Sequence, residues 1–214
     1  MRKYTYLAAG AAAAALLAAA STGSALAAGG DELTAGGNNV TVGDTISASL
    51  SSAGAVLSTS IGKITCTAST FSATDTTNPA EGVAEATETL HVLSFSGCTS
   101  TISGTTGVRS VGLTSGTAPV ATVVDEPSDN PIDLDLSPSV TVVLNTVLGP
   151  ISCIYAGAVV GVVSNAAGTI TFTNQAVSRQ TGSSFACPST GTYSATYGNV
   201  DDTSMAGSPG VIVN

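Results

Sequence analysis

The sequence predicts an all-β protein: an antiparallel sandwich or barrel of about 8–10 strands, stapled by two disulfides. Runs rich in Val, Ile and Thr recur along the chain, and turn signals built from Gly, Asn and Pro separate them. Beyond residue 27, apolar residues do not recur at helical spacing, so no crossover helices are available for a parallel sheet. The chain also has four cysteines, an even number that is typical of a disulfide framework.

Strands are expected between the turn signals, and the run 169–176 is the clearest. Its alternation places Ile170 and Phe172 toward a core and the intervening threonines toward water. The runs 119–124 and 140–144 are more uniformly apolar, which is typical of central strands. The expected strands are 40–50, 55–68, 83–95, 107–113, 119–124, 132–144, 151–163, 169–176, 191–197 and 210–213.

The first 27 residues have the three parts of a secretory signal peptide. Arg2 and Lys3 form a positive start, residues 7–20 are an uninterrupted apolar run, and Ala25-Leu26-Ala27 is a small-x-small ending. The apolar run is shorter than the roughly 20 residues that span a bilayer, so a membrane anchor is the less favoured alternative. We expect cleavage after Ala27.

The expected organisation is a signal peptide at 1–27, a flexible N-terminal arm at 28–39 and a secreted β domain at 40–214. The arm is rich in Gly and Asn, which favour loops. Export places the mature protein outside the cell or at the cell wall.

Composition limits the partners of the mature chain. Only 9% of the residues are charged, against about 25% in a typical domain, and 59 residues are Ser or Thr. Beyond the leader, three basic residues (Lys63, Arg109 and Arg179) stand against all 14 acidic ones, a net charge of −11. Such a chain does not attract phosphate backbones or anionic lipids. We therefore expect no nucleic-acid partner and no membrane association after cleavage.

The four cysteines are expected to form two disulfides, and three pairings are possible. We favour Cys66–Cys98 and Cys153–Cys187, because their spacings of 32 and 34 are nearly equal. Cys66 and Cys153 both end a Gly-x-Ile-hydroxyl-Cys pattern. This echo indicates either a duplicated half-domain, with halves of about 40–124 and 132–214, or two similar hairpins. Zinc is not expected, because the cysteines are not clustered.

Candidates for catalysis are few. His91 is the only histidine, and as a general base it needs a serine and a carboxylate brought to it by the fold. Glu81, Glu85 and Glu88 suggest a carboxylate pair for glycoside hydrolysis, but strand spacing places Glu81 and Glu85 on one face and Glu88 on the other. We therefore predict no catalytic residue and no cofactor, and interpret His91 as a half-exposed strand residue.

An acidic segment gives one weak metal candidate. Calcium prefers six to eight oxygen ligands, and Asp125, Asp129, Asp133 and Asp135 supply carboxylates. Pro138 stands where an EF-hand loop needs glycine, so that motif is excluded. A solvated acidic loop is the favoured interpretation, and no metal is assigned.

A resemblance is carried by residues 62–71, 78–79 and 93–98, and by 144–149, 153–156, 170–175, 187–188 and 193–197. These segments and their cysteines resemble a group of uncharacterised secreted actinobacterial proteins with four cysteines, which implies export. In composition the chain is also similar to the acidic apoproteins of neocarzinostatin-type chromoproteins. That likeness implies a secreted β-sandwich with two disulfides and a cleft for an apolar molecule.

Three functions are consistent with these observations. The first is a secreted non-enzymatic β protein that acts at a surface through an unknown protein or cell-wall partner. The second is a carrier of a small apolar molecule, which requires an apolar pocket between the sheets. The third is a secreted hydrolase, which requires His91 or a carboxylate pair to lie in a cleft.

Overall fold

The computed structural model describes residues 32–51, 53–124 and 132–214, and in these ranges it consists of strands and turns without a helix. All strand pairings are antiparallel, which confirms the predicted all-β class. The strands in chain order are β1 (Leu33–Ala35), β2 (Asn38–Asn39), β3 (Thr45–Leu50), β4 (Ala55–Thr59), β5 (Gly62–Thr77), β6 (Thr87–Ser100), β7 (Thr105–Leu113), β8 (Val120–Val124), β9 (Ile132–Leu136), β10 (Ser139–Thr146), β11 (Gly149–Ala156), β12 (Val159–Ser164), β13 (Thr169–Arg179), β14 (Thr190–Asp202) and β15 (Val211–Val213).

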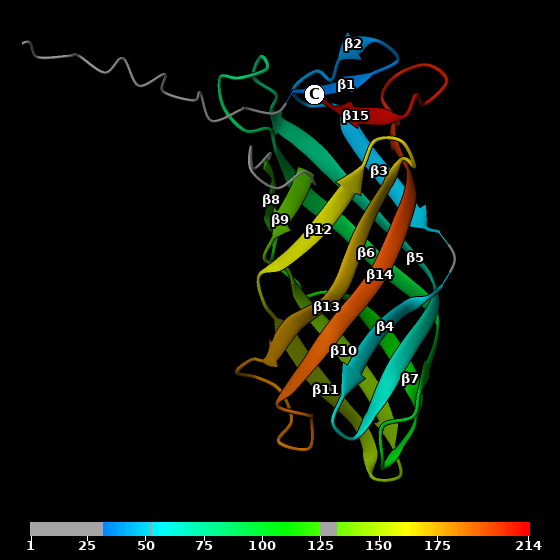
Figure 1. Cartoon of the computed structure of the whole chain (residues 1–214). Helices are drawn as coiled ribbons and strands as arrows, with labels where there is room; N and C mark the ends of the chain where they lie inside the picture. The colour runs from blue at the N-terminus through cyan, green and yellow to red at the C-terminus, as the bar shows by residue number, and fades with distance from the viewer. Residues whose placement is uncertain (1–31, 52, 125–131) are drawn as a thin grey trace, which may run out of the picture.

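Twelve of these strands form one sheet that closes on itself as an elongated barrel. The long strands β5, β6, β13 and β14 run along most of its length (Figure 1). Toward the end that carries β1, β2 and β15, they join β3, β8, β9 and β12 in an upper ring with the order β5-β6-β8-β9-β12-β13-β14-β3. Toward the other end they join β4, β7, β10 and β11 in a lower ring with the order β5-β6-β7-β10-β11-β13-β14-β4.

The strands are more numerous than expected because three predicted strands are pairs of strands, and because β1 and β2 form where no strand was expected. The predicted run 55–68 contains the β4–β5 turn, 132–144 contains the break at Pro138, and 151–163 contains the break at Gly157. A Cβ atom at Gly157 would lie 2.4 Å from the carbonyl oxygen of Ala176, so only glycine lets β11 pass into β12 this close to β13.

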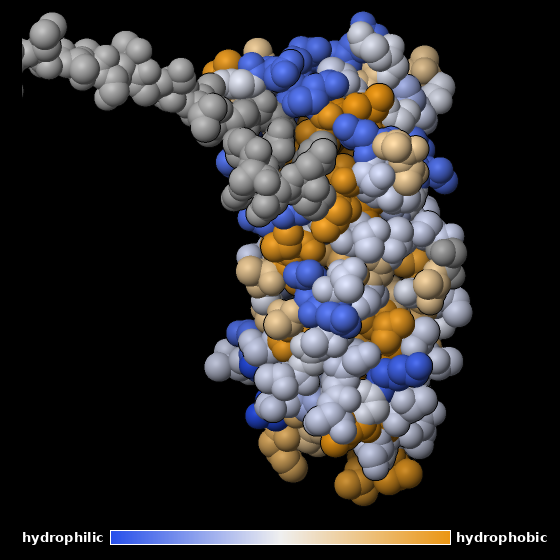
Figure 2. Space-filling view, in the orientation of Figure 1, coloured by the Kyte–Doolittle hydropathy of each residue, from blue (hydrophilic) through white to orange (hydrophobic). Residues whose placement is uncertain are grey.

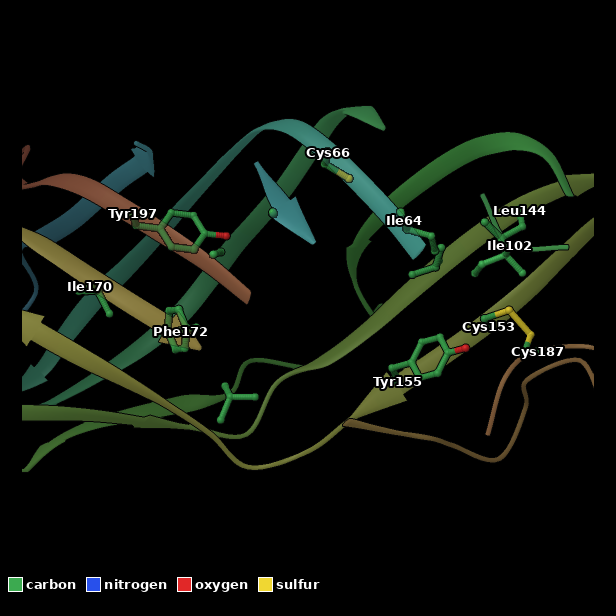
Figure 3. Packing of buried hydrophobic residues seen from close by; sticks show 14 of the residues in the cluster. Ile64, Cys66, Ile102, Leu144, Cys153, Tyr155, Ile170, Phe172, Cys187 and Tyr197 are labelled. Carbon is green, nitrogen blue, oxygen red and sulfur yellow. A yellow bond between two sulfur atoms is a disulfide. The ribbon is translucent and has the colours of Figure 1, made fainter. Parts of the chain in front are cut away.

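Apolar side chains line the inside of the barrel, and hydroxyl side chains cover much of its outside. Ile170 and Phe172 are buried, as their alternation predicted. Phe172 contacts Tyr197 edge to face, with ring centroids 6.2 Å apart, and Phe71 contacts the same tyrosine at 5.2 Å. Figure 3 shows Tyr197 and Phe172 reaching from different strands into the same interior space. Gly161 leaves room for the ring of Phe172, because a Cβ atom at Gly161 would lie 2.7 Å from that ring.

Both favoured disulfide pairings are confirmed. Cys66–Cys98 joins directly opposed residues of β5 and β6, and Cys153–Cys187 joins β11 to the β13–β14 loop. The segments 40–124 and 132–214 each contribute strands to both rings, so neither forms a closed unit alone. The duplication stays a prediction.

The upper end is closed by a small sheet with the order β15-β1-β2. Residues 28–39 were expected to be a flexible arm, but the described part of that segment forms β1 and β2. The reason is burial: Leu33 and Ala35 are 2% and 1% exposed, and they pair with Val213 and Val211. The side-chain amide of Asn78 hydrogen-bonds to the backbone of β1 in the way that a neighbouring strand would. Its oxygen accepts from the Leu33 amide (2.7 Å), and its nitrogen donates to the Leu33 carbonyl (2.8 Å).

Replacing Asn78 tests how the small sheet is held. The Asn78→Ala substitution leaves the Leu33 amide and carbonyl, and the Val40 carbonyl, without their side-chain partner. We expect the free energy of unfolding to fall by about 2–3 kcal/mol, measured by urea titration. Asn38→Ala is the control, because exposed Asn38 makes one long bond to Gly36. Equal effects of the two substitutions would contradict this account.

Candidate functional site

The inside of the barrel holds a cavity of about 160 Å³. Its walls are almost entirely apolar and come from both rings and the small sheet. A cavity of about 150 Å³ lined by Leu, Ile and Phe is known to stay dry and to bind benzene. The lining includes Leu33, Leu57, Ile64, Phe71, Leu90, Leu93, Val111, Leu134, Val142, Tyr155, Phe172, Tyr193, Tyr197 and Val213.

A groove of about 260 Å³ lies where the upper ring gives way to the lower ring. It is lined by residues of β8, β9 and β12 and of the turns that follow β9 and precede β12, among them Val120, Asp135 and Ser137. Leu136 and Val159 line both this groove and the interior cavity. These two side chains therefore separate the cavity from the surface at this seam between the rings.

Glu88 is the charged residue in the cavity wall. It lies on β6, opposite Asp75 of β5 and Ala121 of β8. Its side chain is 5% exposed, and no described residue forms a hydrogen bond with its carboxyl group. Burial, and then the charge of Asp75, raise the pKa of Glu88 to about 8. At neutral pH this carboxyl group is therefore mostly protonated.

Asp75 continues the acidic cluster toward the upper end. It is 1% exposed, and neither carboxyl oxygen accepts a hydrogen bond of ordinary geometry, although the nearby amides of Thr77 and Thr76 lower its pKa. Burial first, and Asp44 second, raise that pKa to about 6. Asp202, fully buried beside this group, accepts from the Ser204 amide through one oxygen only.

A second polar feature beside the cavity is a chain of three hydroxyl groups, two of which belong to lining residues, Tyr193 and Tyr197. Tyr197 hydrogen-bonds to Ser69 at 2.8 Å and to Tyr193 at 3.0 Å. Burial raises the pKa of Tyr193 well above its ordinary value and also raises that of Tyr197, so both stay protonated. Three hydroxyl protons serve two bonds, so one proton of the chain is not used within it.

The calcium candidates are only partly covered by the structure. Asp133 and Asp135 lie on β9, on the face opposite Leu134 and Leu136, which line the cavity. Asp125 and Asp129 lie outside the described residues. Within the described ranges, no group of three or more His, Cys, Asp or Glu residues is arranged to hold a metal ion. The calcium hypothesis stays a prediction.

The residues considered for hydrolysis do not come together. His91 is exposed at a bulge of β6, and the strand expected at 83–95 begins only at Thr87. Glu81 and Glu85 are therefore exposed in the β5–β6 connection and do not share a strand face, while Glu88 points inward. The spacing of Glu81, Glu85 and Glu88 in the sequence did not indicate that Glu88 lies opposite Asp75. The signal was the alternation of Ala86, Glu88 and Leu90, which are all buried.

Comparisons of the chain with protein families, with curated proteins and with solved structures find no match. The two resemblances expected from the sequence stay predictions. Among the described residues, no helix has the length and apolar character to cross a membrane.

The buried carboxyl group predicts how stability depends on pH. Because the pKa of Glu88 is about 8 in the folded chain and 4.5 ordinarily, the folded chain binds more protons between these values. The free energy of unfolding is therefore expected to fall as the pH rises from about 4.5 to 8, by on the order of 4 kcal/mol from this group.

Glu88→Gln removes this titration. Chemical denaturation across pH 4–9 should give a flatter profile for the variant, with the gain in stability confined to the alkaline side. Glu85→Gln is the matched control, because Glu85 is exposed. Parallel pH profiles for the wild type and Glu88→Gln would contradict the burial of a protonated Glu88.

Proposed function

We propose that this chain is a secreted, non-enzymatic β protein that carries a small apolar molecule inside its barrel. The observation that supports carriage best is the apolar cavity of about 160 Å³ on the barrel axis. The closed sheet fixes the walls of this space, and the seam with Leu136 and Val159 gives a short path to it. Ligand sites are commonly such concave, apolar spaces with few polar groups.

The size of the cavity limits the ligand and its affinity. A molecule near the size of benzene buries about 200 Å² and gains about 5 kcal/mol on leaving water. That gain corresponds to a dissociation constant of roughly 0.1–1 mM without any polar contact. A natural ligand that binds more tightly must also use the polar groups in the wall.

Filling the cavity from one strand tests carriage. Ala73 lines the cavity and is 5% exposed, whereas Ala68 on the same strand is exposed on the outer face. Toluene should raise the thermal unfolding midpoint of the wild type and of Ala68→Leu, because it binds only the folded chain. Ala73→Leu should lose this rise. An equal rise in both variants, or none in the wild type, would overturn the proposal.

A second candidate function, contact with a protein partner, is favoured by the distribution of charge. All acidic residues in the described ranges lie in the upper ring, the small sheet or their connections. The three basic residues, Lys63, Arg109 and Arg179, lie on lower-ring segments that contain no acid. The two ends of the barrel are therefore of opposite charge.

The lower end also exposes apolar side chains on its loops. Val147 and Leu148 in the β10–β11 turn are 84% and 97% exposed, Phe185 is 94% exposed, and Ile61 is 46% exposed. Figure 2 shows apolar surface at the lower tip of the face in view. The occupant that fits best is the upper end of a second copy, which is acidic and exposes Val42, Val83 and Ile212.

This contact predicts self-association that salt weakens. Sedimentation velocity at low ionic strength should show an average mass that rises with protein concentration, and a rise to about 0.5 M salt should reduce it. The Leu148→Ser and Phe185→Ser substitutions together should abolish the association. A monomer at every concentration would exclude contact between copies.

A further inference from the structure

We propose that the molecule carried in the barrel is a small apolar amine, held through an ion pair between its ammonium group and the Glu88 carboxylate. This inference rests on the proposed carriage and adds the chemical class of the ligand. It depends on the placement of Glu88, on the charges around it and on the apolar space beside it.

The first argument is that Glu88 has no partner among the described residues. A carboxyl group removed from water normally recovers its hydrogen bonds inside the protein, because an unpaired buried group is costly. Glu88 is 5% exposed, lines the cavity and makes no hydrogen bond to a described residue. A bound molecule with a donor group supplies the missing contact.

The second argument is the sign of the charge around Glu88. Asp75 lies directly opposite on β5, and Asp44 and Asp202 lie next to Asp75. The residue opposite on β8 is the neutral Ala121. The described basic residues are all in the lower ring. The electrostatic potential at Glu88 is therefore negative, so it attracts a cationic ligand and repels a carboxylate. A neutral alcohol gains only a hydrogen bond to the carboxyl group.

The third argument is the apolar space beside the carboxyl group. Leu90 follows Glu88 on the inner face of β6, and Phe71 with Phe172 continues the wall toward the middle of the barrel. An amine with a ring or a short chain places its charged end at Glu88 and its apolar body against these side chains. The cavity of about 160 Å³ limits that body to about one ring.

Proton balance gives this proposal a pH signature. Below pH 8, an ammonium ion that pairs with Glu88 displaces the proton of its carboxyl group, because the pKa of Glu88 is about 8 in the empty protein. Amine binding should therefore tighten as the pH rises from 6 to 8, by up to about tenfold per unit. Titration of Asp75, with a pKa of about 6 and Asp44 and Asp202 beside it, acts in the same direction.

The test uses four probes with one aromatic body: benzylamine, benzyl alcohol, toluene and benzoate. At pH 8, calorimetric titration of the folded chain should show benzylamine binding at least tenfold more tightly than benzyl alcohol or toluene, and no benzoate binding. Glu88→Gln should remove the preference for the amine and keep toluene binding. Glu85→Gln, which changes an exposed carboxylate, should keep the preference.

The outcomes separate the ligand class from carriage itself. If toluene binds and benzylamine binds no more tightly than benzyl alcohol, the amine proposal is overturned and carriage stands. If no probe binds, both are overturned. An amine preference that survives in Glu88→Gln also overturns the role of Glu88. The preference of the wild type and its change with pH decide the matter even if Glu88→Gln does not fold.

Discussion

The barrel depends on the backbone hydrogen bonds within two long hairpins, β5–β6 and β13–β14. Each hairpin belongs to both rings, and short strands bridge the two hairpins on either side. The upper ring closes through pairing at several positions of each strand, whereas in the lower ring β7 pairs with β6 at one position and β11 pairs with β13 at two. Residues of the β13–β14 loop hydrogen-bond to part of the remaining β11 edge. Closure fixes the width of the interior. With 4% aromatic residues and no Trp, the chain has few side chains large enough to fill that width, and a cavity results.

The acidic groups in the upper half act against this stabilisation. Asp75, Glu88 and Asp202 are buried without a basic partner among the described residues, and each such group lowers stability. Apolar side chains at the same positions would give a more stable barrel. Local departures from the rules of folding are typical of functional sites. Glu88 is both a buried acidic group without a basic partner among the described residues and part of the cavity wall.

Local patterns predicted the features that depend on neighbours in sequence. Alternation identified Ile170 and Phe172 as core residues, and near-equal spacing identified both disulfides. The two rings were beyond such reasoning, because one long strand pairs with different short strands at its two ends. The hydroxyl chain was equally hidden, since Ser69 and Tyr197 are 128 residues apart. The inward orientation of Glu88 was predictable from the alternation of its neighbours. It was not recognised because the strand was expected to begin at residue 83, whereas β6 begins at Thr87.

The seam between the rings has a kinetic consequence. Because the short strands change there while the long strands continue, movement of the Leu136 and Val159 side chains opens a path without breaking the pairing of either hairpin. Side-chain motion is far faster than unfolding of a closed sheet. Under the proposed carriage, a molecule inside the barrel would exchange on the timescale of these side-chain movements, and its residence time would be independent of the lifetime of the fold.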